Sequence, residues 1–453
     1  MTRSADPWTR LASGVVFPLH EHVKGHSTTA RLRALEVSQW WAPERIEAVR
    51  VERLRALLAD AAQHVPYYRR AFADSAFDPA SVRSLADLAR LPLLTKAVIR
   101  SNTDALKADD AGVLKRYNTG GSSGEPLVFY MGRDRISHDV AAKWRATRWW
   151  GVDIGDPEIV VWGSPIELSA QDRVRRARDW LLRTRLLPAF EMSPANLDRF
   201  VAEIRRARPR MVFGYPSALV YIAEHAQRKG QRLDDLGIRV AFVTSERLYD
   251  HQRETIATAF GCRVANGYGG RDAGFVAHEC PSGGMHISAE DIVVEIVGAQ
   301  GEALAPGHSG EIVVTHLATR DFPFVRYRTG DVGVLDDRAC PCGRGLPMLK
   351  EIEGRSTDFV VAEDGTVMHG LALIYILRDL PEIAAFKIVQ ESRQCVRIQV
   401  VSAAPLADAT TALIRNGFAA RLGAAVEVEI QRVDSIPPER SGKFRYVVSH
   451  ALP

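Results

Sequence analysis

The segment Thr119–Pro126 (TGGSSGEP) holds the densest group of residues suited to bind an anion. Glycine lets the backbone approach an anion closely, and successive N–H groups and hydroxyls can then bind phosphate oxygens. A flexible turn is the alternative that this peptide alone leaves open. A Walker A loop is excluded, because no Lys-Ser or Lys-Thr pair follows at the required spacing. Three glycines and three hydroxyl residues fill the first six positions: Thr119, Gly120, Gly121, Ser122, Ser123 and Gly124.

Cysteine and histidine residues form two short-range pairs, each on a turn with glycine or proline. Cys280 and His286 make a C-x5-H pair, and Cys340 and Cys342 make a C-x-C pair. Two such pairs could close a tetrahedral Cys3His zinc site, and four protein ligands would make it structural. His278 is the alternative histidine. Reduced thiols that pack as small apolar groups are the alternative to a metal.

Three further motifs place a charged residue beside a glycine. Asp331, in RYRTGD, is suited to accept hydrogen bonds from a ribose diol. Arg355 and Asp358 follow Gly354, and Lys443 follows Gly442 near the C-terminus. Taken singly, these motifs fit an ordinary Asp turn, a charged linker and a solvated lysine better than a functional site.

In this order along the chain, the motifs resemble the adenylate-forming superfamily. The resemblance is to its phenylacetate–CoA ligase-like branch, which includes capsule-biosynthesis relatives. The segments Val65–Tyr68 (VPYY), Leu91–Lys96 (LPLLTK) and Gly214–Ser217 (GYPS) add to it. Each short motif is weak, whereas their combination in the right order is specific, and the match runs over most of the chain.

The resemblance implies an enzyme that uses ATP to convert a carboxylic acid into an acyl- or aryl-adenylate, with release of pyrophosphate. The acyl group then passes to CoA. A phosphate loop, a segment beside the adenine and residues at the ribose would bind ATP and AMP. By resemblance these residues are Thr119, Gly120, Gly121, Ser122, Ser123 and Gly124, then Ser245, Glu246, Tyr268, Gly269 and Arg271, then Asp331 and Arg355.

The catalytic residues implied by the resemblance are Lys443, Arg355 and Asp272. Lys443 would meet the carboxylate and the α-phosphate, and Asp358 takes the hinge position of a mobile small domain. The family usually carries Glu at the magnesium site, where this chain has Asp272 in the run YGGRD. Aspartate is shorter but is still a hard oxygen ligand for Mg²⁺. The alternative is that Asp272 pairs with Arg271 or another base, which would suit a relative that binds nucleotide without turnover.

The acid and the acceptor stay open from the sequence. Trp162, Tyr215 and Ser245 are predicted to line the substrate pocket, and an aromatic wall would suit an aryl or arylacetic acid. CoA is the acceptor that the resemblance implies. An amine, a sugar or a carrier thiol is the alternative, because capsule-type relatives belong to the same branch and no CoA-specific motif is readable.

The elements that must position these residues indicate an α/β fold. Short apolar runs alternate with helical stretches between residues 158 and 243, which is typical of a parallel sheet whose ligands bind beyond the carboxyl ends of its strands. Residues 285–335 indicate a β-rich subdomain, and the segments after Gly354 approximate β-α-β-β-α-β. We therefore predict a large ATP- and carboxylate-binding domain, 1–354, and a small mobile α+β domain, 355–453, that carries Lys443.

Composition is that of a globular protein. Of 453 residues, 46% are hydrophobic and 25% charged, and 59 basic minus 55 acidic residues give +4. This small charge argues against a nucleic-acid partner. No uncharged apolar run reaches the ~18 residues of a membrane span. Five cysteines make no disulfide framework, so we expect the cytoplasm.

The Arg-rich run 173–185 (RVRRARDWLLRTR) favours a solvated amphipathic helix. An anionic partner, the CoA phosphates or a membrane surface is the alternative for this run.

Overall fold

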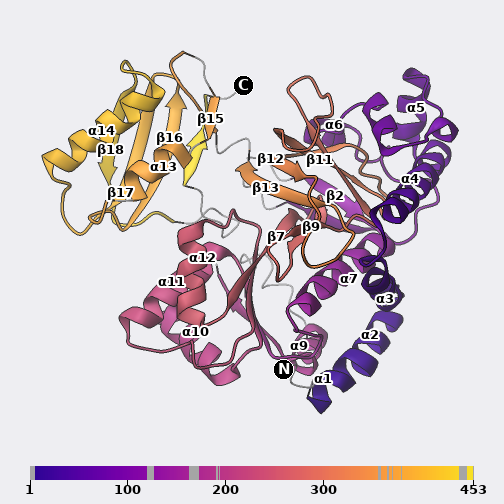
Figure 1. Cartoon of the computed structure of the whole chain (residues 1–453), viewed down its shortest axis with the longest axis horizontal. Coiled ribbons are helices and arrows are strands. Elements are labelled where there is room, and N and C mark those ends of the chain that lie inside the picture. Colours follow the sequence, from indigo (N-terminus) through magenta and orange to yellow (C-terminus); the bar gives the residue numbers. More distant parts are fainter. Residues whose placement is uncertain are drawn as a thin grey trace. The chain divides into compact units, whose positions relative to one another are not determined.

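The computed structural model describes most of the chain in two compact units (Figure 1). The first unit holds Met1–Thr329 and Gly333–Ile352, and the second holds Gly330–Val332 and Glu353–Pro453. The roles predicted for domains 1–354 and 355–453 stay a proposal. The described residues are 6–119, 127–162, 173–189, 192, 194–355, 359–364, 367–369, 371–378, 380–437 and 446–451.

Helices make up the N-terminal part of the first unit. Helix α4 begins at Pro43, a residue favoured in the first turn, and it buries Leu54 and Leu58 in a core shared with Phe129 and Phe324. The elements are α1 (Pro7–Leu11), the π-helical turn η1 (Ala12–Val16), α2 (Phe17–Val23), α3 (Thr28–Ser38), α4 (Pro43–His64), α5 (Pro66–Asp74), the 3-10 turns η2 (Pro79–Ser81) and η3 (Leu85–Arg90), and α6 (Lys96–Ser101).

A short hairpin and a long helix lead into the main sheet. Strands β1 (Lys115–Asn118) and β2 (Val128–Met131) are antiparallel, with Asn118 opposite Val128. The glycine-rich segment therefore connects two paired strands. Helix α7 (Arg133–Trp149) follows and buries Arg135, His138 and Arg145.

The predicted parallel sheet is confirmed. Apolar strands run in the order β4-β3-β5-β6-β7, and neighbours in this series are parallel. Gly214 ends β5 so close to β3 that an added Cβ would lie 2.5 Å from the carbonyl oxygen of Val161. The elements are β3 (Glu158–Trp162), α9 (Arg173–Leu181), β4 (Thr184–Pro188), α10 (Pro194–Ala207), β5 (Met211–Gly214), α11 (Pro216–Arg228), β6 (Val240–Thr244), α12 (Asp250–Phe260) and β7 (Arg263–Gly270).

The β-rich segment predicted over 285–335 extends this sheet. After β7 the chain turns back as antiparallel β8, and the complete order is β10-β11-β12-β13-β9-β8-β7-β6-β5-β3-β4. The added strands are β8 (Gly274–Glu279), β9 (Met285–Ile287), β10 (Ile292–Val297), β11 (Ser309–His316), β12 (Tyr327–Asp336) and β13 (Met348–Arg355).

The second unit has a four-stranded sheet in the order β18-β17-β16-β19. β16 and β17 form a hairpin in which Ser392 lies opposite Cys395. β14 pairs with β15 in a separate two-stranded sheet, and β19 lies beside β16 in parallel. The elements are β14 (Phe359–Val361), β15 (Val367–His369), α13 (Leu371–Arg378), β16 (Ala385–Ser392), β17 (Cys395–Val401), α14 (Asp408–Leu422), β18 (Glu427–Arg432) and β19 (Val447–Ser449).

None of the helices in the described part of the chain has the length and apolar character needed to cross a bilayer. The cytoplasmic location and the absence of a nucleic-acid partner stay predictions.

Candidate active site and metal centre

Three residues predicted to line the substrate pocket lie at the ends of neighbouring parallel strands. Val161 lies opposite Gly214, and Gly214 lies opposite Val243, so Trp162 at the end of β3, Tyr215 after β5 and Ser245 after β6 come to the same edge of the sheet. Trp162 is half-buried and stacks on buried Tyr215, with ring centroids 4.4 Å apart and ring planes inclined by 26°. The parallel register therefore forms an aromatic wall at the carboxyl edge.

The segment after β6 makes an irregular turn at this edge. Ser245 has a φ of 71°, in the left-handed region that non-glycine residues seldom adopt. The next residue, Glu246, accepts a hydrogen bond of 3.2 Å through Oε2 from the backbone N–H of Ser217, in the first turn of α11. A carboxylate at a helix N-terminus satisfies an orphan N–H group and is favoured by the helix dipole. The strained turn is therefore tied to the helix that follows Tyr215.

The end of β7 places Tyr268, Gly269, Arg271 and Asp272 beside the same edge. Thr244 lies opposite Gly267, so Tyr268 follows in register with Ser245. The chain then reverses so tightly that a Cβ on Gly269 would lie 2.1 Å from the carbonyl oxygen of Gly274. Only glycine fits there, and this explains the glycine in YGGRD.

Asp272, the predicted magnesium ligand, is held from three directions. Tyr327 donates a hydrogen bond of 2.6 Å from its hydroxyl to Oδ2, and the N–H of Ala273 donates one of 3.1 Å to Oδ1. Arg135 donates to the backbone carbonyl of Asp272 at 3.1 Å. The half-buried carboxylate keeps further lone pairs on two oriented oxygens, so its donor chemistry fits Mg²⁺.

A buried polar cluster contacts this turn through Arg135. Arg135 pairs with Asp139 at 2.9 Å, and Asp139 faces His138 at 3.4 Å and His316 at 3.6 Å. Burial alone would raise the pKa of Asp139, but the charge of Arg135 and hydrogen bonds from both histidines hold it well below its usual range. Burial and Arg135 lower the pKa of His316 to about 3.

His138, Asp139 and His316 lie close enough for a metal, but their hydrogen bonds favour another role. The N–H of Ala318 donates to Nδ1 of His316 at 3.2 Å, which leaves the proton of the neutral ring on Nε2. Nε2 is the atom that faces Asp139, at 3.6 Å, so the neutral imidazole turns its N–H toward the carboxylate. Asp139 holds the Arg135 side chain in place, and Arg135 in turn holds the Asp272 turn through its hydrogen bond to the backbone carbonyl.

Arg271 connects this turn to the start of the glycine-rich segment. Its Nη1 donates to the carbonyl of Asn118 at 3.1 Å. The next residue, Thr119, donates its N–H to the carbonyl of Leu127 at 3.0 Å and accepts from the N–H of Leu127 through its hydroxyl at 2.9 Å. Both ends of the segment are therefore fixed next to Arg271.

The remaining predicted residues are placed only in part. Asp331 is half-buried in β12, two residues beyond Thr329, whose hydroxyl lies 3.5 Å from that of Tyr268. The backbone of Arg355 ends β13. Gly120, Gly121, Ser122, Ser123, Gly124, Asp358 and Lys443 lie outside the described residues.

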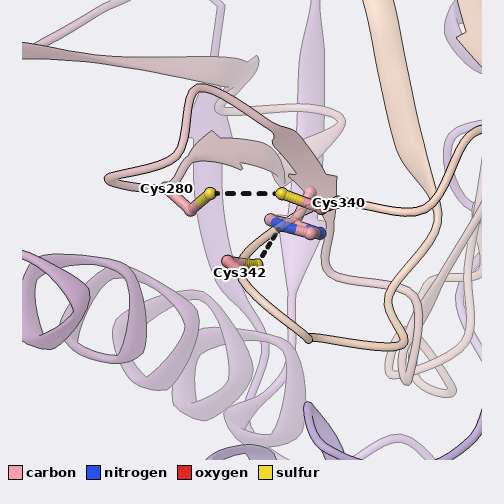
Figure 2. Close-up of side chains that lie close together, drawn as sticks. Cys280, Cys340 and Cys342 are labelled. Atoms are coloured by element: carbon pink, nitrogen blue, oxygen red, sulfur yellow. Dashed lines mark hydrogen bonds between the residues drawn. The ribbon is translucent and has the colours of Figure 1, made fainter.

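The structure brings the four predicted zinc ligands together (Figure 2). Sγ of Cys280 lies 3.6 Å from Sγ of Cys340, and Nε2 of His286 lies 3.1 Å from Sγ of Cys342. Bonds of ~2.0–2.3 Å to one tetrahedral zinc ion would separate such ligand atoms by roughly 3.5–3.8 Å. Cys280 follows β8, His286 lies on β9, and Cys340 and Cys342 lie in the segment before β13. The sulfur–sulfur distance fits the ion, and the nitrogen–sulfur distance is shorter than the bound ion would set.

The surroundings of the cluster also suit a metal. Nδ1 of His286 lies 3.2 Å from the carbonyl oxygen of Leu346, and such a hydrogen bond leaves Nε2 as the ligand atom. Burial lowers the pKa of His286 to about 4, so its ring is neutral at neutral pH. His278, the alternative histidine, stacks on Phe275 instead and lies outside the cluster.

Comparison with known proteins gives consistent matches. Residues 360–450 match the family model described as the CapK C-terminal domain. The chain is 27% identical to phenylacetate-coenzyme A ligase of Thermus thermophilus, over 75% of this chain and 77% of that one. It is 24% identical to protein CapK of Staphylococcus aureus, over 81% of each.

A solved structure of 2-hydroxyisobutyryl-CoA ligase in complex with 2-HIB-AMP has a TM-score of 0.72, with 22% identity and 90% of each chain covered. The fold is therefore that of the adenylate-forming enzymes. In sequence the chain is similar to the phenylacetate–CoA ligases and to CapK, which confirms the resemblance seen in the motifs.

Sequence reasoning missed Tyr327 and Arg135 as partners of Asp272. Tyr327 lies inside the RYRTGD motif, but nothing in that motif shows which residue its hydroxyl contacts. Arg135 lies 137 positions before Asp272 on a helix, without a local signal. Pairings of this kind depend on the tertiary fold.

Proposed function

We propose that this chain is an AMP-forming ligase that activates a carboxylic acid and transfers it to CoA. The carboxylate oxygen attacks the α-phosphorus of ATP, and the bond from that phosphorus to the leaving pyrophosphate breaks. The sulfur of CoA then attacks the acyl carbon, and AMP leaves. The protein itself takes little part in making or breaking bonds. It accelerates the reaction by positioning the substrates and by stabilising the charge of the transition state.

The observation that carries this proposal is the meeting of three segments at one sheet edge. The aromatic wall of Trp162 and Tyr215, the strained turn at Ser245 and the oriented Asp272 follow β3, β5, β6 and β7 in register. Arg271 then places the start of the glycine-rich segment beside them. An acid pocket, a nucleotide-facing turn and an anion-binding loop in that arrangement suit adenylate formation.

The roles of individual residues are part of the proposal. Asp272 would hold Mg²⁺, which when bound neutralises phosphate charge. Asp331 would accept hydrogen bonds from the ribose hydroxyls, Arg355 would contact ribose or phosphate, and Lys443 would meet the carboxylate and the α-phosphate. Asp358 would be the hinge residue of the mobile small domain.

Pyrophosphate release from ATP over a panel of carboxylic acids tests the first half-reaction, with Lys443→Ala as the comparison. We expect acid-dependent release that falls at least 100-fold in the variant, because a charge on the reacting oxygens is lost. Measurable ATP binding without release for any acid would contradict the proposal and favour the relative that binds nucleotide without turnover. Mass spectrometry of the product with CoA, and with amine, sugar or carrier acceptors, then identifies the acceptor. The similarity to CapK keeps a non-CoA acceptor as the second candidate.

We also propose that Cys280, His286, Cys340 and Cys342 hold a structural zinc ion. Four converging ligands leave no open position for catalysis. They join the β8–β9 turn to the segment before β13, in the sheet that also carries β7 and Asp272. The ion would therefore stabilise the scaffold of the site without taking part in the reaction.

A further inference from the structure

Exposed apolar side chains are unevenly distributed over the described chain. Ten large hydrophobic residues are exposed, and six of them lie within the first 40 residues: Leu11, Val15, Leu19, Val23, Val37 and Trp40. Scattered single exposures are ordinary, whereas a concentration on one segment marks an interaction surface. The N-terminal helices therefore carry a candidate interaction surface that is separate from the active site.

Four of these residues form a continuous stripe. Leu11, Val15, Leu19 and Val23 recur at every fourth position along α1, η1 and α2, with exposed fractions of 44, 56, 60 and 78%. A four-residue repeat drifts about 40° per step around an ideal α-helix, because each residue turns the chain by about 100°. The π-helical turn Ala12–Val16 turns the chain by less per residue and offsets this drift. The four side chains thus stay on one face.

The opposite face of the same helices is anchored. Ala12 and Phe17 are buried in a cluster with Leu32, Trp144 and Ile154. Pro18, which lacks an N–H, accounts for the disturbed helical ladder just before it. The helices are therefore held rigidly with their apolar stripe turned outward.

A second segment extends this surface. The ring N–H of Trp8 donates to the carbonyl of Leu181 at 3.0 Å, and Arg183 pairs with Asp6 at 2.7 Å. These contacts place the end of α9 beside α1 (Figure 1). Trp180 at that end is 76% exposed. We name Leu11, Val15, Leu19, Val23 and Trp180 the N-terminal apolar face.

The acidic side chains around this face are engaged by other residues. Between Asp6 and Glu36 the basic residues are Arg10, Lys24, Arg31 and Arg33, and the acidic residues are Asp6, Glu21 and Glu36. Asp6 pairs with Arg183 and Glu36 with Arg148, and Asp179, next to Trp180, pairs with Arg178. Glu21 is only 4% exposed and is engaged by Thr28 and His26, and Arg31 pairs with Asp134. Arg10, Lys24 and Arg33 are exposed, so the accessible charge of the segment is positive.

We propose that the N-terminal apolar face docks the protein onto an anionic lipid surface. An amphipathic helix with apolar and basic residues together partitions into the headgroup region of a bilayer, and tryptophan favours the same depth. A second copy of this chain would fit the face less well than an anionic lipid surface, because a two-fold pairing of the stripe would bring like charges together. The proposal is independent of the proposed function.

Sedimentation with vesicles tests it. The full-length protein is mixed with phosphatidylcholine vesicles and with vesicles that contain about 30% phosphatidylglycerol. We expect binding to the anionic vesicles and about tenfold weaker binding for the triple variant Leu11→Ser, Leu19→Ser, Val23→Ser, which loses buried apolar area. The matched control is Val113→Ser, Leu413→Ser, which removes exposed apolar groups elsewhere. It should bind as the unaltered protein does.

A second variant separates charge from apolar contact. Arg10→Gln, Arg33→Gln should reduce the preference for anionic vesicles about 30-fold, since each of the two basic residues near the surface contributes about 1 kcal/mol. Thermal melts confirm that the variants fold. No binding to anionic vesicles at low salt, or equal losses in the triple variant and its control, would overturn the proposal. A halved molar mass of the triple variant in light scattering would also overturn it, in favour of a second copy.

Discussion

The hydroxyl of Tyr327 donates a hydrogen bond of 2.6 Å to Asp272, although 55 positions separate the two residues. Tyr327 is fully buried and its ring meets Phe324 edge-on, with centroids 5.0 Å apart. The donor is therefore fixed by packing. It orients a carboxylate at the end of a tight turn and leaves the carboxylate's other lone pairs for a cation.

Tyr327→Phe should weaken the use of magnesium. The substitution keeps the ring and removes one hydrogen bond to a charged acceptor, which contributes about 1.5 kcal/mol or more. We expect the apparent KM for Mg²⁺·ATP to rise about tenfold while the KM for the acid stays the same. Magnesium titrations of pyrophosphate release measure this. Tyr221→Phe, on the exposed side of α11, is the control, and an unchanged magnesium dependence would argue against Asp272 as the ligand.

Trp162→Ala should change which acids react. The indole stacks on Tyr215 at the sheet edge, so its removal leaves a larger pocket. We expect kcat/KM for bulkier aryl acids to rise at least tenfold relative to the acids that the unaltered protein prefers. Competition assays with acid pairs report this ratio. Tyr215→Phe keeps the wall and should leave the ratio unchanged, and a uniform loss for all acids in Trp162→Ala would assign the indole to packing alone.

Metal analysis of the purified protein should find about one zinc ion per chain. Cys342→Ser should lose the ion and lower Tm by roughly 5 °C or more, because a structural zinc contributes directly to folding. The control Cys395→Ser, on β17 of the second unit, should keep the zinc ion and leave Tm unchanged. A metal-free protein with full stability would remove the zinc proposal.

The stability of the first unit should fall in mild acid through His316. Its pKa in the folded chain, about 3, lies below the usual value near 6.5, so protons bind the unfolded chain more tightly. The stabilisation is complete above about pH 6.5 and is lost as the pH falls toward 3. Arg135, His138, Asp139 and Asp291 are the titratable and charged groups that act on this ring.

His316→Asn removes this titration while its amide oxygen can still accept the N–H of Ala318. Near pH 5.5, the free energy of unfolding of the unaltered protein should change by up to ~1.4 kcal/mol more per pH unit than that of the variant. Urea unfolding at several pH values measures both slopes. Asp139 titrates at lower pH and does not interfere. Parallel curves would show that the ring is already charged or solvent-accessible.

Local patterns predicted much of the fold. Short apolar runs followed by Gly, Ser or Thr located β3, β5 and β6, because a buried parallel strand must be apolar on both faces. The strand β14 lies in a separate two-stranded sheet, which the approximate order β-α-β-β-α-β did not indicate. It is followed by Asp364-Gly365, a dipeptide that favours a hairpin, and β14 indeed pairs with β15.

From the sequence, only those residues of the candidate site that lie in a recognisable motif could be predicted. The spacing of the cysteine and histidine pairs indicated the cluster at Cys280, and the structure brings all four residues together. The partners of Asp272 could not be found in this way, because Arg135 reaches it from helix α7 and Tyr327 from β12, both far away in the sequence. Which acid fits beside Trp162 depends on side-chain volumes at strand ends, which no motif records.

The two hydrogen bonds between Thr119 and Leu127 also have a practical consequence. They close the frame of the glycine-rich segment at the end of the β1–β2 pair, so the ladder from Lys115 to Asn118 is complete without the residues between. A substitution that removes the Thr119 hydroxyl should therefore weaken the end of the β1–β2 pair itself, at the point where Arg271 contacts Asn118.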